Sequence, residues 1–221
     1  RRHAFAKDAE AECAQAEQKL GSYPVFVKPC SEGSSVGVSK ATDRASLKAG
    51  LAEAFKYDSK VLVEEFIDGH EIEVAVLGNE EPTATFAGEI APSQEFYTFE
   101  AKYVDGTSGL YIPAHISEKA MQTVREDAVR VYRALGCKGL SRVDFFCTYA
   151  EDEIVFNEIN TIPGSLSFYL WEPLGVSYPE LLERMISLGM KRHRERAALT
   201  FSFESNVLSG IHLGGAKGTK V

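Results

Sequence analysis

The segment Leu140–Asn160 constrains the fold most strongly, because its residues alternate between two faces on both sides of a polar turn. In LSRVDFF, polar Arg142 and Asp144 fall on one face, whereas apolar Val143 and Phe145 fall on the other. In IVFNEIN, the residues expected to share a face are Ile154, Phe156, Glu158 and Asn160. This pattern predicts a two-stranded antiparallel hairpin.

A turn centred on Glu151 places Asp144 directly opposite Glu158, and Arg142 opposite Asn160. Directly opposed Cβ atoms lie about 4.5–5.5 Å apart. Two carboxylates at that separation either raise one pKa or bind a cation. With the Asn160 oxygen the set is all oxygen, which suits Mg²⁺. The alternative is a solvated acidic face, and a register change of one residue would separate the pair.

The segment VKPCSEGSSVG has features of a phosphate site. Lys28 ends an apolar strand, and the loop at residues 32–37 follows. Its glycines let the backbone approach an anion, and its serine hydroxyls can donate hydrogen bonds. The loop is not a Walker motif, because no GK[ST] follows. A plain Gly/Ser turn between two strands is the alternative interpretation.

The segment VLVEEFIDGHEIE is an apolar strand that ends in two acids and continues into Phe66 and Ile67. Such an edge can present backbone groups and a carboxylate to the rim of a purine. Glu71 follows at a distance from which it could reach a ribose hydroxyl. The alternative is a pair of ordinary strands with acidic solvent faces. The residues after Glu71 alternate as in a half-buried strand, with Ile72, Val74 and Val76 on one face.

Helix and loop signals fill the rest of the chain. Helices are predicted from Ala4 to Leu20, around 46–55, after Ser117, and from Ser177 to a stop at Gly189. The apolar stripe of the third is Val124, Ala128, Val131, Tyr132 and Leu135. Residues 94–111 are irregular, as in a functional lid, and the Gly- and Lys-rich residues 204–221 predict a disordered tail. Because the order lacks a βαβαβ rhythm, the predicted class is α+β.

Composition excludes some classes of protein. The 24 basic and 32 acidic residues of the 221-residue chain give a net charge of −8, which argues against a nucleic-acid-binding surface. The four cysteines lack CxxC spacing, so a reducing, cytoplasmic environment is predicted. No apolar run is long enough to predict a membrane span, and no secretory signal is visible.

Together, VKPCSEGSSVGV, VLVEEFIDGHEIEVAVLG, EAKY, GLSRVDFF and NEINTIPG resemble the D-alanine–D-alanine ligases of the ATP-grasp superfamily, in the family's order. The resemblance covers residues 23–188. It implies two α+β lobes, with mainly antiparallel sheets, that clasp ATP. Residues 1–65 would belong to the central lobe, 66–203 to the C-terminal lobe with its lid, and 204–221 to the tail.

The resemblance also implies roles for individual residues. ATP would be held by Lys28, Glu64, Glu65, Phe66, Ile67, Glu71, Lys102 and Phe146. Two Mg²⁺ ions, or Mn²⁺, would be held by Asp144, Glu158 and Asn160. Lys102 would reach the transferring phosphate, Ser34 and Tyr103 would close the site over the first D-alanine, and Arg142 with Gly164 would stabilise the tetrahedral intermediate. The second substrate would be bound by Arg142, Gly164, Tyr169 and Leu170.

The implied reaction converts one D-alanine into an acyl phosphate, which the amine of a second amino acid attacks, for peptidoglycan precursor synthesis. In the family a preceding domain supplies a substrate-orienting glutamate, and another ATP lysine precedes this region. We therefore expect a C-terminal portion that is inactive alone, from an enzyme that could form a homodimer. Tyr169 and Leu170 replace a common Ser-Leu pair, so the acceptor could be D-alanine, D-serine or D-lactate. A nucleotide-binding module without turnover is the alternative from another class.

Overall fold

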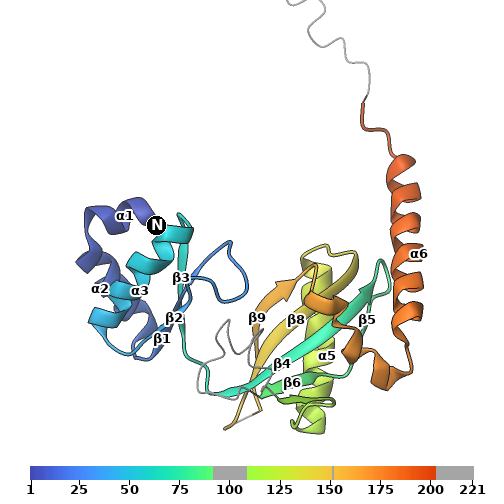
Figure 1. The fold of residues 1–221 in the computed structure, drawn as a ribbon, viewed down its shortest axis with the longest axis horizontal. Helices are drawn as coiled ribbons and strands as arrows, with labels where there is room; N and C mark the ends of the chain where they lie inside the picture. Colours follow the sequence, from blue (N-terminus) through green and yellow to red (C-terminus); the bar gives the residue numbers. More distant parts are fainter. Residues whose placement is uncertain (92–108, 151, 203–221) are drawn as a thin grey trace, which may run out of the picture.

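The computed structural model describes residues 1–91, 109–150 and 152–202, which form two antiparallel sheets with their helices (Figure 1). The sheets lie in two lobes, and the predicted α+β class with antiparallel sheets is confirmed. The first lobe contains α1 (Arg2–Lys7), α2 (Ala9–Leu20), β1 (Val25–Pro29), β2 (Ser39–Ala41), α3 (Arg44–Tyr57) and β3 (Val61–Glu65). Its strand order is β2-β1-β3. The predicted domain boundaries stay predictions.

The first lobe packs its two longer helices, α2 and α3, on one face of its sheet. Val25 and Val27 of β1 pack with Leu47 and Leu51 of α3, and all four side chains are almost completely buried. Phe26 and Lys28 alternate with these valines, so their side chains lie on the sheet face that is opposite α2 and α3.

The prediction of a single helix from Ala4 to Leu20 is wrong, because Asp8 separates two helices, α1 and α2. Asp8 has an extended backbone, with φ −154°, and its carboxylate accepts a hydrogen bond from the Ala11 amide at 2.9 Å. An aspartate that caps a new helix ends the previous one. The predicted end at Gly21 is confirmed, since this glycine is left-handed with φ 78°.

The second lobe has the strand order β7-β6-β4-β8-β9, with β5 paired to β4. Its strands are β4 (Gly69–Gly78), β5 (Thr83–Ala84), β6 (Gly88–Ala91), β7 (Gly109–Tyr111), β8 (Gly139–Thr148) and β9 (Ile154–Asn160). Its helices are α5 (Glu118–Ala134), the short 3-10 helices η1 (Gly164–Leu170) and η2 (Glu172–Leu174), and α6 (Tyr178–Ala197). Within the described part of the chain, no helix is long and apolar enough to cross a bilayer.

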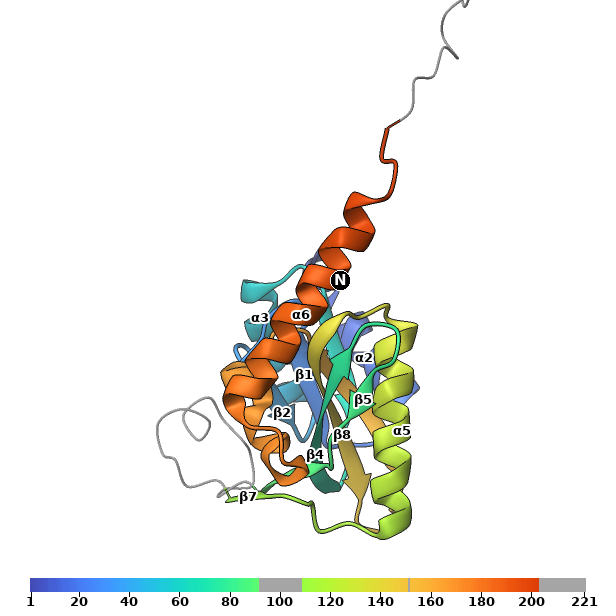
Figure 2. The ribbon, with the colours of Figure 1, turned by 90° about the vertical axis from the view of Figure 1, so that its right-hand side faces the viewer.

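Strand β4 lies at the centre of this sheet and is buried on both faces. α5 lies along one side of the sheet and α6 along the other (Figure 2). Ile72 and Val74 pack toward α5, whereas Ala75 packs with Leu170 of η1 and Leu181 of α6. The prediction of a half-buried strand is therefore wrong from Ile72 onward. The sequence pattern shows one apolar face, but it does not show that η1 and α6 cover the other.

The hairpin of β8 and β9 confirms the predicted register where it matters for the site. Arg142 pairs with Asn160, and Asp144 pairs with Glu158. The register then shifts by one residue, so that Phe145 pairs with Phe156. The residue left over in β9 is Asn157, which makes a β-bulge.

This bulge overturns the predicted common face of β9. Ile154 and Ile159 both pack against the core under α5, although four residues lie between them and regular alternation would place them on opposite faces. Phe156 also lies on this side, where its ring contacts Phe145 at a centroid distance of 5.9 Å. Glu158 and Asn160 lie on the opposite face, because one unpaired residue reverses the alternation.

The ends of α5 and α6 differ in how well they were predicted. Ser117 caps α5 as expected, and Val124, Ala128 and Tyr132 are buried, but Leu135 is 59% exposed beyond the helix end. The predicted stop of α6 at Gly189 is wrong, since the helix continues to Ala197. A glycine inside a helix costs only about 1 kcal/mol, and α6 contacts the turn after β4 on both sides of Gly189, through Asn79 with the Leu188 carbonyl and Glu80 with Lys191.

Tyr132 joins α5 to the two longest strands, and its hydroxyl is a good test of that packing. The hydroxyl lies 2.5 Å from the Gly78 carbonyl oxygen and 3.0 Å from that of Gly139, in a fully buried position. We expect Tyr132→Phe to lower the free energy of unfolding by about 1–3 kcal/mol, because a buried carbonyl loses its donor. Urea unfolding would measure this change. An unchanged midpoint would contradict it.

The two lobes are connected by Phe66, Ile67 and Asp68. Directly after them, Gly69 lies against β8 so closely that a Cβ atom would be 2.3 Å from the Cys147 carbonyl oxygen. Across the lobes, Lys28 Nζ donates to Asn157 Oδ1 at 3.2 Å. The bulge of β9 therefore carries the residue that contacts the first lobe.

Candidate functional site

The acidic pair lies on the face of the second sheet that is opposite α5. Asn160 connects its two carboxylates, because Asn160 Nδ2 lies 2.9 Å from Asp144 Oδ2 and 3.5 Å from Glu158 Oε1. The structure thus brings together the three predicted metal ligands. The part of the chain that the structure describes contains no group of three His, Cys, Asp or Glu placed to hold a metal ion.

Two carboxylates and an amide nevertheless fit a magnesium ion of the kind that uses substrate phosphates. Mg²⁺ typically takes one or two carboxylates and completes its shell with water and phosphate oxygens. Asp144 and Glu158 offer hard oxygens from opposed positions, and half a turn of the Asn160 amide would present its oxygen beside them. The donor chemistry of the site therefore suits the predicted ion.

Arg142 lies next to the acidic pair and binds Asp144 with two parallel hydrogen bonds. Arg142 Nε and Nη2 donate to Asp144 Oδ1 and Oδ2, each at 2.7 Å. Burial alone would lower the pKa of Arg142, but the hydrogen bonds to Asp144 raise it above its usual value. A bidentate arginine is geometrically fixed. The guanidinium is therefore a permanent, well-placed positive charge at the site.

Glu73 is the functional candidate that sequence reasoning missed. It pairs with Asp144 across β4 and β8, is 2% exposed, and its Oε2 lies 3.2 Å from Arg142 Nε. Burial raises the pKa of Glu73 to about 7, against the opposing charge of Arg142. The sequence offers no signal for this burial, because Glu73 alternates with Ile72 and Val74 and so reads as a residue of the solvent face.

The first lobe presents a second group of predicted residues to the site. Lys28 Nζ forms an ion pair with Glu64 at 2.5 Å, on the sheet face that the helices leave open. Phe66 lies beside Phe26, with ring centroids 6.1 Å apart, and Lys40 Nζ lies 4.6 Å from the centroid of the Phe66 ring. Lys40 and Phe26 add a cation and an aromatic surface to the predicted set.

Not all predicted nucleotide residues lie on this face. Glu65 pairs with Val25 at the end of β3, so its side chain alternates to the face opposite Glu64. Glu71 and Phe146 pair directly across β4 and β8, on the same face as Asp144. The structure therefore groups Glu71 and Phe146 with the acidic pair, and separates Glu65 from both sets.

The segment that contains Tyr169 covers β4 beside Glu73. η1 begins at exposed Gly164, and its next three residues are all left-handed, with φ 48° at Ser165, 54° at Leu166 and 48° at Ser167. Such strain in non-glycine residues often occurs at functional sites. Burial raises the pKa of Tyr169, and the Glu73 carboxylate raises it further.

The remaining predicted site residues have different positions. The Leu170 side chain is completely buried, which leaves only its backbone to reach a ligand. Ser34 lies in the Gly/Ser loop with a positive φ of 54°. Lys102 and Tyr103 lie outside the described residues, as do the lid apart from Gly109–Tyr111 and the predicted tail from residue 204.

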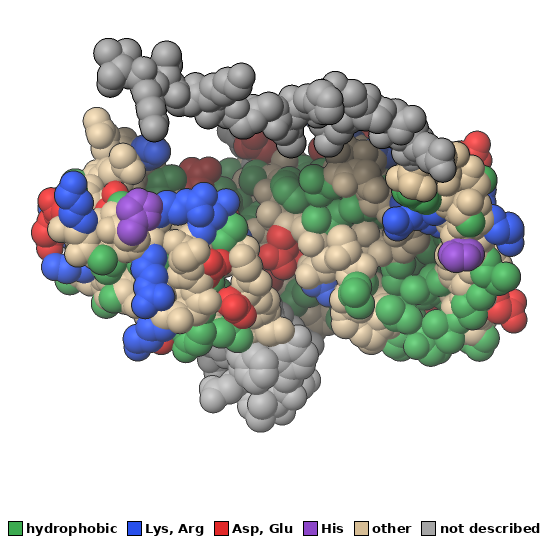
Figure 3. Space-filling model, turned by 90° about the horizontal axis from the view of Figure 1, so that it is seen from above, with side chains coloured by type: hydrophobic (Ala, Val, Ile, Leu, Met, Phe, Trp, Pro, Cys, Tyr) green, Lys and Arg blue, Asp and Glu red, His purple; other side chains and the backbone are tan. Residues whose placement is uncertain are grey.

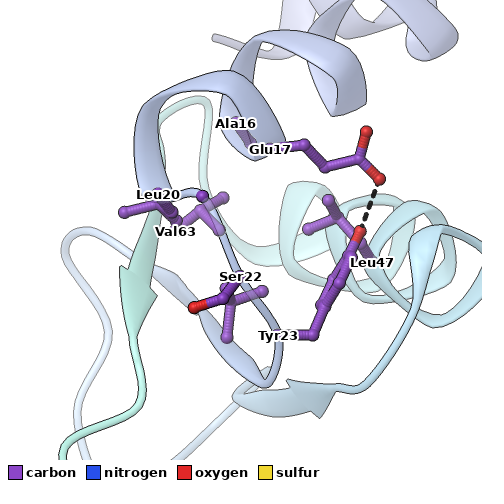
Figure 4. Close-up of a pocket in the computed structure, with 9 residues that line it drawn as sticks. Ala16, Glu17, Leu20, Ser22, Tyr23, Leu47 and Val63 are labelled. Carbon is purple, nitrogen blue, oxygen red and sulfur yellow. Dashed lines mark hydrogen bonds between the residues drawn. The ribbon is translucent and has the colours of Figure 1, made fainter.

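A separate pocket of 240 Å³ lies in the first lobe, on the helix side of the sheet (Figure 4). Its charged group is the carboxylate of Glu17, which accepts a hydrogen bond from the Tyr23 hydroxyl at 2.8 Å and pairs with Arg44. Burial raises the pKa of Tyr23 to about 12. The pocket is therefore a small apolar space with its charge already neutralised, on the opposite side of the sheet from Lys28.

The molecular surface differs between the two lobes. Seen from above, Lys and Arg side chains gather on the first lobe, while apolar side chains cover much of the second (Figure 3). At the site, Asp144 is paired with Arg142, and Asn157 of the bulge accepts a hydrogen bond from Lys28 of the first lobe. The site thus combines carboxylates from one lobe with a lysine from the other, an arrangement that suits an anion and a divalent cation together.

The sequence of this chain matches the model of one known protein family. The model described as D-ala D-ala ligase C-terminus matches residues 1–187. The chain belongs to the D-alanine–D-alanine ligase family. The predicted resemblance is confirmed.

Relatives of the ligase family match the chain over most of its length. The D-alanine–D-alanine ligase of Geobacillus thermodenitrificans is 49% identical over 208 residues, which are 92% of this chain and 56% of the relative. That of Acetivibrio thermocellus is 50% identical over 192 residues, covering 85% of this chain and 51% of the relative. The chain thus spans about half the length of the curated ligases it matches.

Solved ligase structures agree with the observed fold. A D-alanine-D-alanine ligase from Coxiella burnetii aligns with a TM-score of 0.71 and 32% identity, over 85% of this chain and 50% of that one. The VanG D-Ala:D-Ser ligase from Enterococcus faecalis aligns with a TM-score of 0.73 and 40% identity, over 82% and 53%. The antiparallel sheets of this chain therefore match half of the ATP-grasp ligase fold.

Proposed function

We propose that this chain forms the nucleotide- and acceptor-binding part of an ATP-dependent ligase that joins D-alanine to a second D-alanine for peptidoglycan precursor synthesis. The observation that carries the proposal is the opposed pair Asp144 and Glu158, connected by Asn160 and next to a bidentate Arg142. Lys28 of the other lobe contacts Asn157, which directly precedes Glu158. Because the chain spans about half of its relatives, the complete reaction is proposed for the whole ligase.

The proposed chemistry has two steps. A carboxylate oxygen of the first D-alanine attacks the γ-phosphorus of ATP, the bond to ADP breaks, and an acyl phosphate forms. The amine of the second amino acid then attacks the acyl carbon, and inorganic phosphate leaves with the electrons of the carbon–oxygen bond. The amine loses a proton in forming the amide. Phosphoryl transfer depends mainly on positioning and charge neutralisation, which is what fixed side chains provide.

The residues of this chain would share that work between the two lobes. Lys28 would bind nucleotide phosphates, and Glu64 with the backbone of Phe66 and Ile67 would bind adenine. Arg142 would bind the oxygen that becomes negative when the amine attacks, a role that a fixed guanidinium serves well. Further proposed contacts are Glu71 and Phe146 for the nucleotide, and Gly164, Tyr169 and the Leu170 backbone for the second substrate.

Asp144, Glu158 and Asn160 would hold Mg²⁺, which when bound neutralises phosphate charge during transfer. Their role is to place hard oxygens beside the phosphate-binding lysine. Lys102 would reach the transferring phosphate, and Ser34 with Tyr103 would close the site over the first D-alanine, which would exclude water from the acyl phosphate. A homodimer of the complete ligase is also proposed.

D-Serine is a second candidate for the acceptor. The observation that favours it is the likeness to the VanG D-Ala:D-Ser ligase, at 40% identity. Tyr169 offers one hydroxyl donor near the proposed acceptor position, and a hydroxyl can bind either a carboxylate or a serine side chain. Phosphate release by the complete ligase, measured in parallel with D-alanine, D-serine and D-lactate as acceptors, would separate these possibilities.

Calorimetry of this chain with Mg²⁺ and a non-hydrolysable ATP analogue tests the binding part of the proposal. We expect saturable binding that chelation of the metal abolishes. A chain that binds nucleotide equally well with EDTA would contradict the metal assignment. Absence of any binding would contradict the proposed function of this part.

Replacing Glu158 by Gln tests the metal site at a single oxygen. We expect binding of the Mg²⁺-nucleotide to weaken by at least about tenfold, because even outer-shell partners of a metal contribute that much. The free energy of unfolding should change little, since the Glu158 side chain is exposed. Glu153→Gln, near the turn of the same hairpin, is the matched control. Equal losses of binding and stability would argue against a metal ligand.

A further inference from the structure

Arg142 lies between two carboxylates that it contacts differently. Its Nε carries one proton, which it donates to Asp144 Oδ1 at 2.7 Å. Glu73 Oε2 is only 3.2 Å from the same nitrogen, and the Glu73 carboxylate also accepts a hydrogen bond from the Tyr169 hydroxyl, which leaves further lone pairs on its two oxygens. Glu73 is thus a buried acceptor with capacity to spare, at a distance from which it could receive the Nε proton.

A cation at the acidic pair would change this balance. Asp144 would then serve two positive groups, the guanidinium and the divalent ion, which repel each other over a few ångströms. The Asp144 oxygens already accept from Arg142 and Asn160. A cation that binds these oxygens weakens their hydrogen bonds with Arg142. A guanidinium with no other acceptor would then lose its fixed position.

We propose that Glu73 is a positioning residue, a second acceptor that retains the Arg142 guanidinium when a divalent cation engages Asp144. Glu73 lies on β4 and cannot follow a movement of β8 side chains, because it is 2% exposed in the packed centre of the sheet. This inference rests on the proposed metal-dependent nucleotide binding.

The structure suggests why the second acceptor would matter for the reaction. A guanidinium that stabilises a developing oxyanion must already be in place when the charge appears. The same metal that neutralises phosphate would tend to free Arg142 from Asp144. Glu73 removes this conflict, because it holds the guanidinium from the side of β4, away from Glu158 on β9.

Nuclear magnetic resonance of the chain labelled with ¹⁵N-arginine tests the proposal. The Nε–H signal of Arg142, assigned by its loss in Arg142→Lys, is followed for hydrogen exchange with and without Mg²⁺ and a non-hydrolysable ATP analogue. In the unmodified chain we expect slow exchange in both states. In Glu73→Met we expect slow exchange without the analogue, and exchange faster by about tenfold or more with it, because a charge-assisted hydrogen bond is lost.

Two further variants complete the experiment. Glu73→Gln keeps a neutral acceptor and should fall between the unmodified chain and Glu73→Met. Glu80→Met removes an exposed carboxylate that pairs with Lys191, far from the site, and should behave like the unmodified chain. Equal exchange in Glu73→Met and the unmodified chain, with the analogue bound in both, would overturn the inference alone. Failure of the analogue to bind the unmodified chain would overturn the proposed function and the inference with it.

Discussion

Arg142→Met should lower the free energy of unfolding by about 3–5 kcal/mol, the largest change that we expect from one substitution in this chain. The guanidinium donates two hydrogen bonds to the Asp144 carboxylate, and its Nε lies 3.2 Å from Oε2 of buried Glu73. Methionine fills most of the volume but leaves two neighbouring carboxylates without a cation. Urea unfolding at neutral pH measures the loss.

A double variant shows whether the uncompensated charge is the cause. Adding Glu73→Gln to Arg142→Met removes one of the two carboxylates that have lost their cation, and it should recover part of the lost stability. Arg130→Met, which removes an exposed arginine paired with Asp127 on α5, is the control and should change stability little. If the double variant is as unstable as the sum of the single changes, the loss comes from packing.

The stability of the unmodified chain should fall by about 3 kcal/mol, relative to Glu73→Gln, as pH rises from about 4.5 to 7. Burial raises the pKa of Glu73 to about 7 in the folded chain, above the ordinary value of 4.5. The folded state therefore binds the proton more tightly than the unfolded state. This stabilisation is complete below the unfolded pKa and is lost as pH rises through the folded pKa.

Unfolding curves of both proteins between pH 4 and 8 measure that difference. The variant retains the other acids, so their titration affects both proteins and cancels in the comparison. The metal must be absent, since a cation at Asp144 would change the charge around Glu73. Parallel stability curves across this range would mean that Glu73 is as easily ionised in the folded chain as in the unfolded one.

The site was predictable where it depends on alternation within one hairpin. Asp144 and Glu158 are opposed as expected, because the distance of each from the turn follows directly from the sequence. The bulge at Asn157 was not predictable in this way, because the same amino acids could form β9 with or without one unpaired residue. Its effect is large, because it places Phe156 and Glu158 on opposite faces of the sheet, whereas regular alternation would place them on the same face.

Residues whose environment depends on distant segments were less predictable. Glu73 looks like a solvent-facing residue of a half-buried strand, and only the packing of η1 and α6 over β4 shows that it is buried. Gly189 looks like a helix stop, but contacts of α6 with the turn after β4 favour continuation. Local signals were reliable at Gly21 and Ser117, where one side chain or one backbone angle decides the end of a helix.

Because one residue of β9 is unpaired, the number of residues in this strand determines which side chains face the acidic site. Ile154 and Ile159 face the core, and Glu158 and Asn160 face the side of the sheet opposite α5, only because Asn157 is unpaired between them. Deleting Asn157 would leave every remaining amino acid unchanged, yet it would force either the isoleucines or the acidic group onto the wrong side of the sheet. For this strand, a loss of one residue would be more damaging than many exchanges of one residue for another.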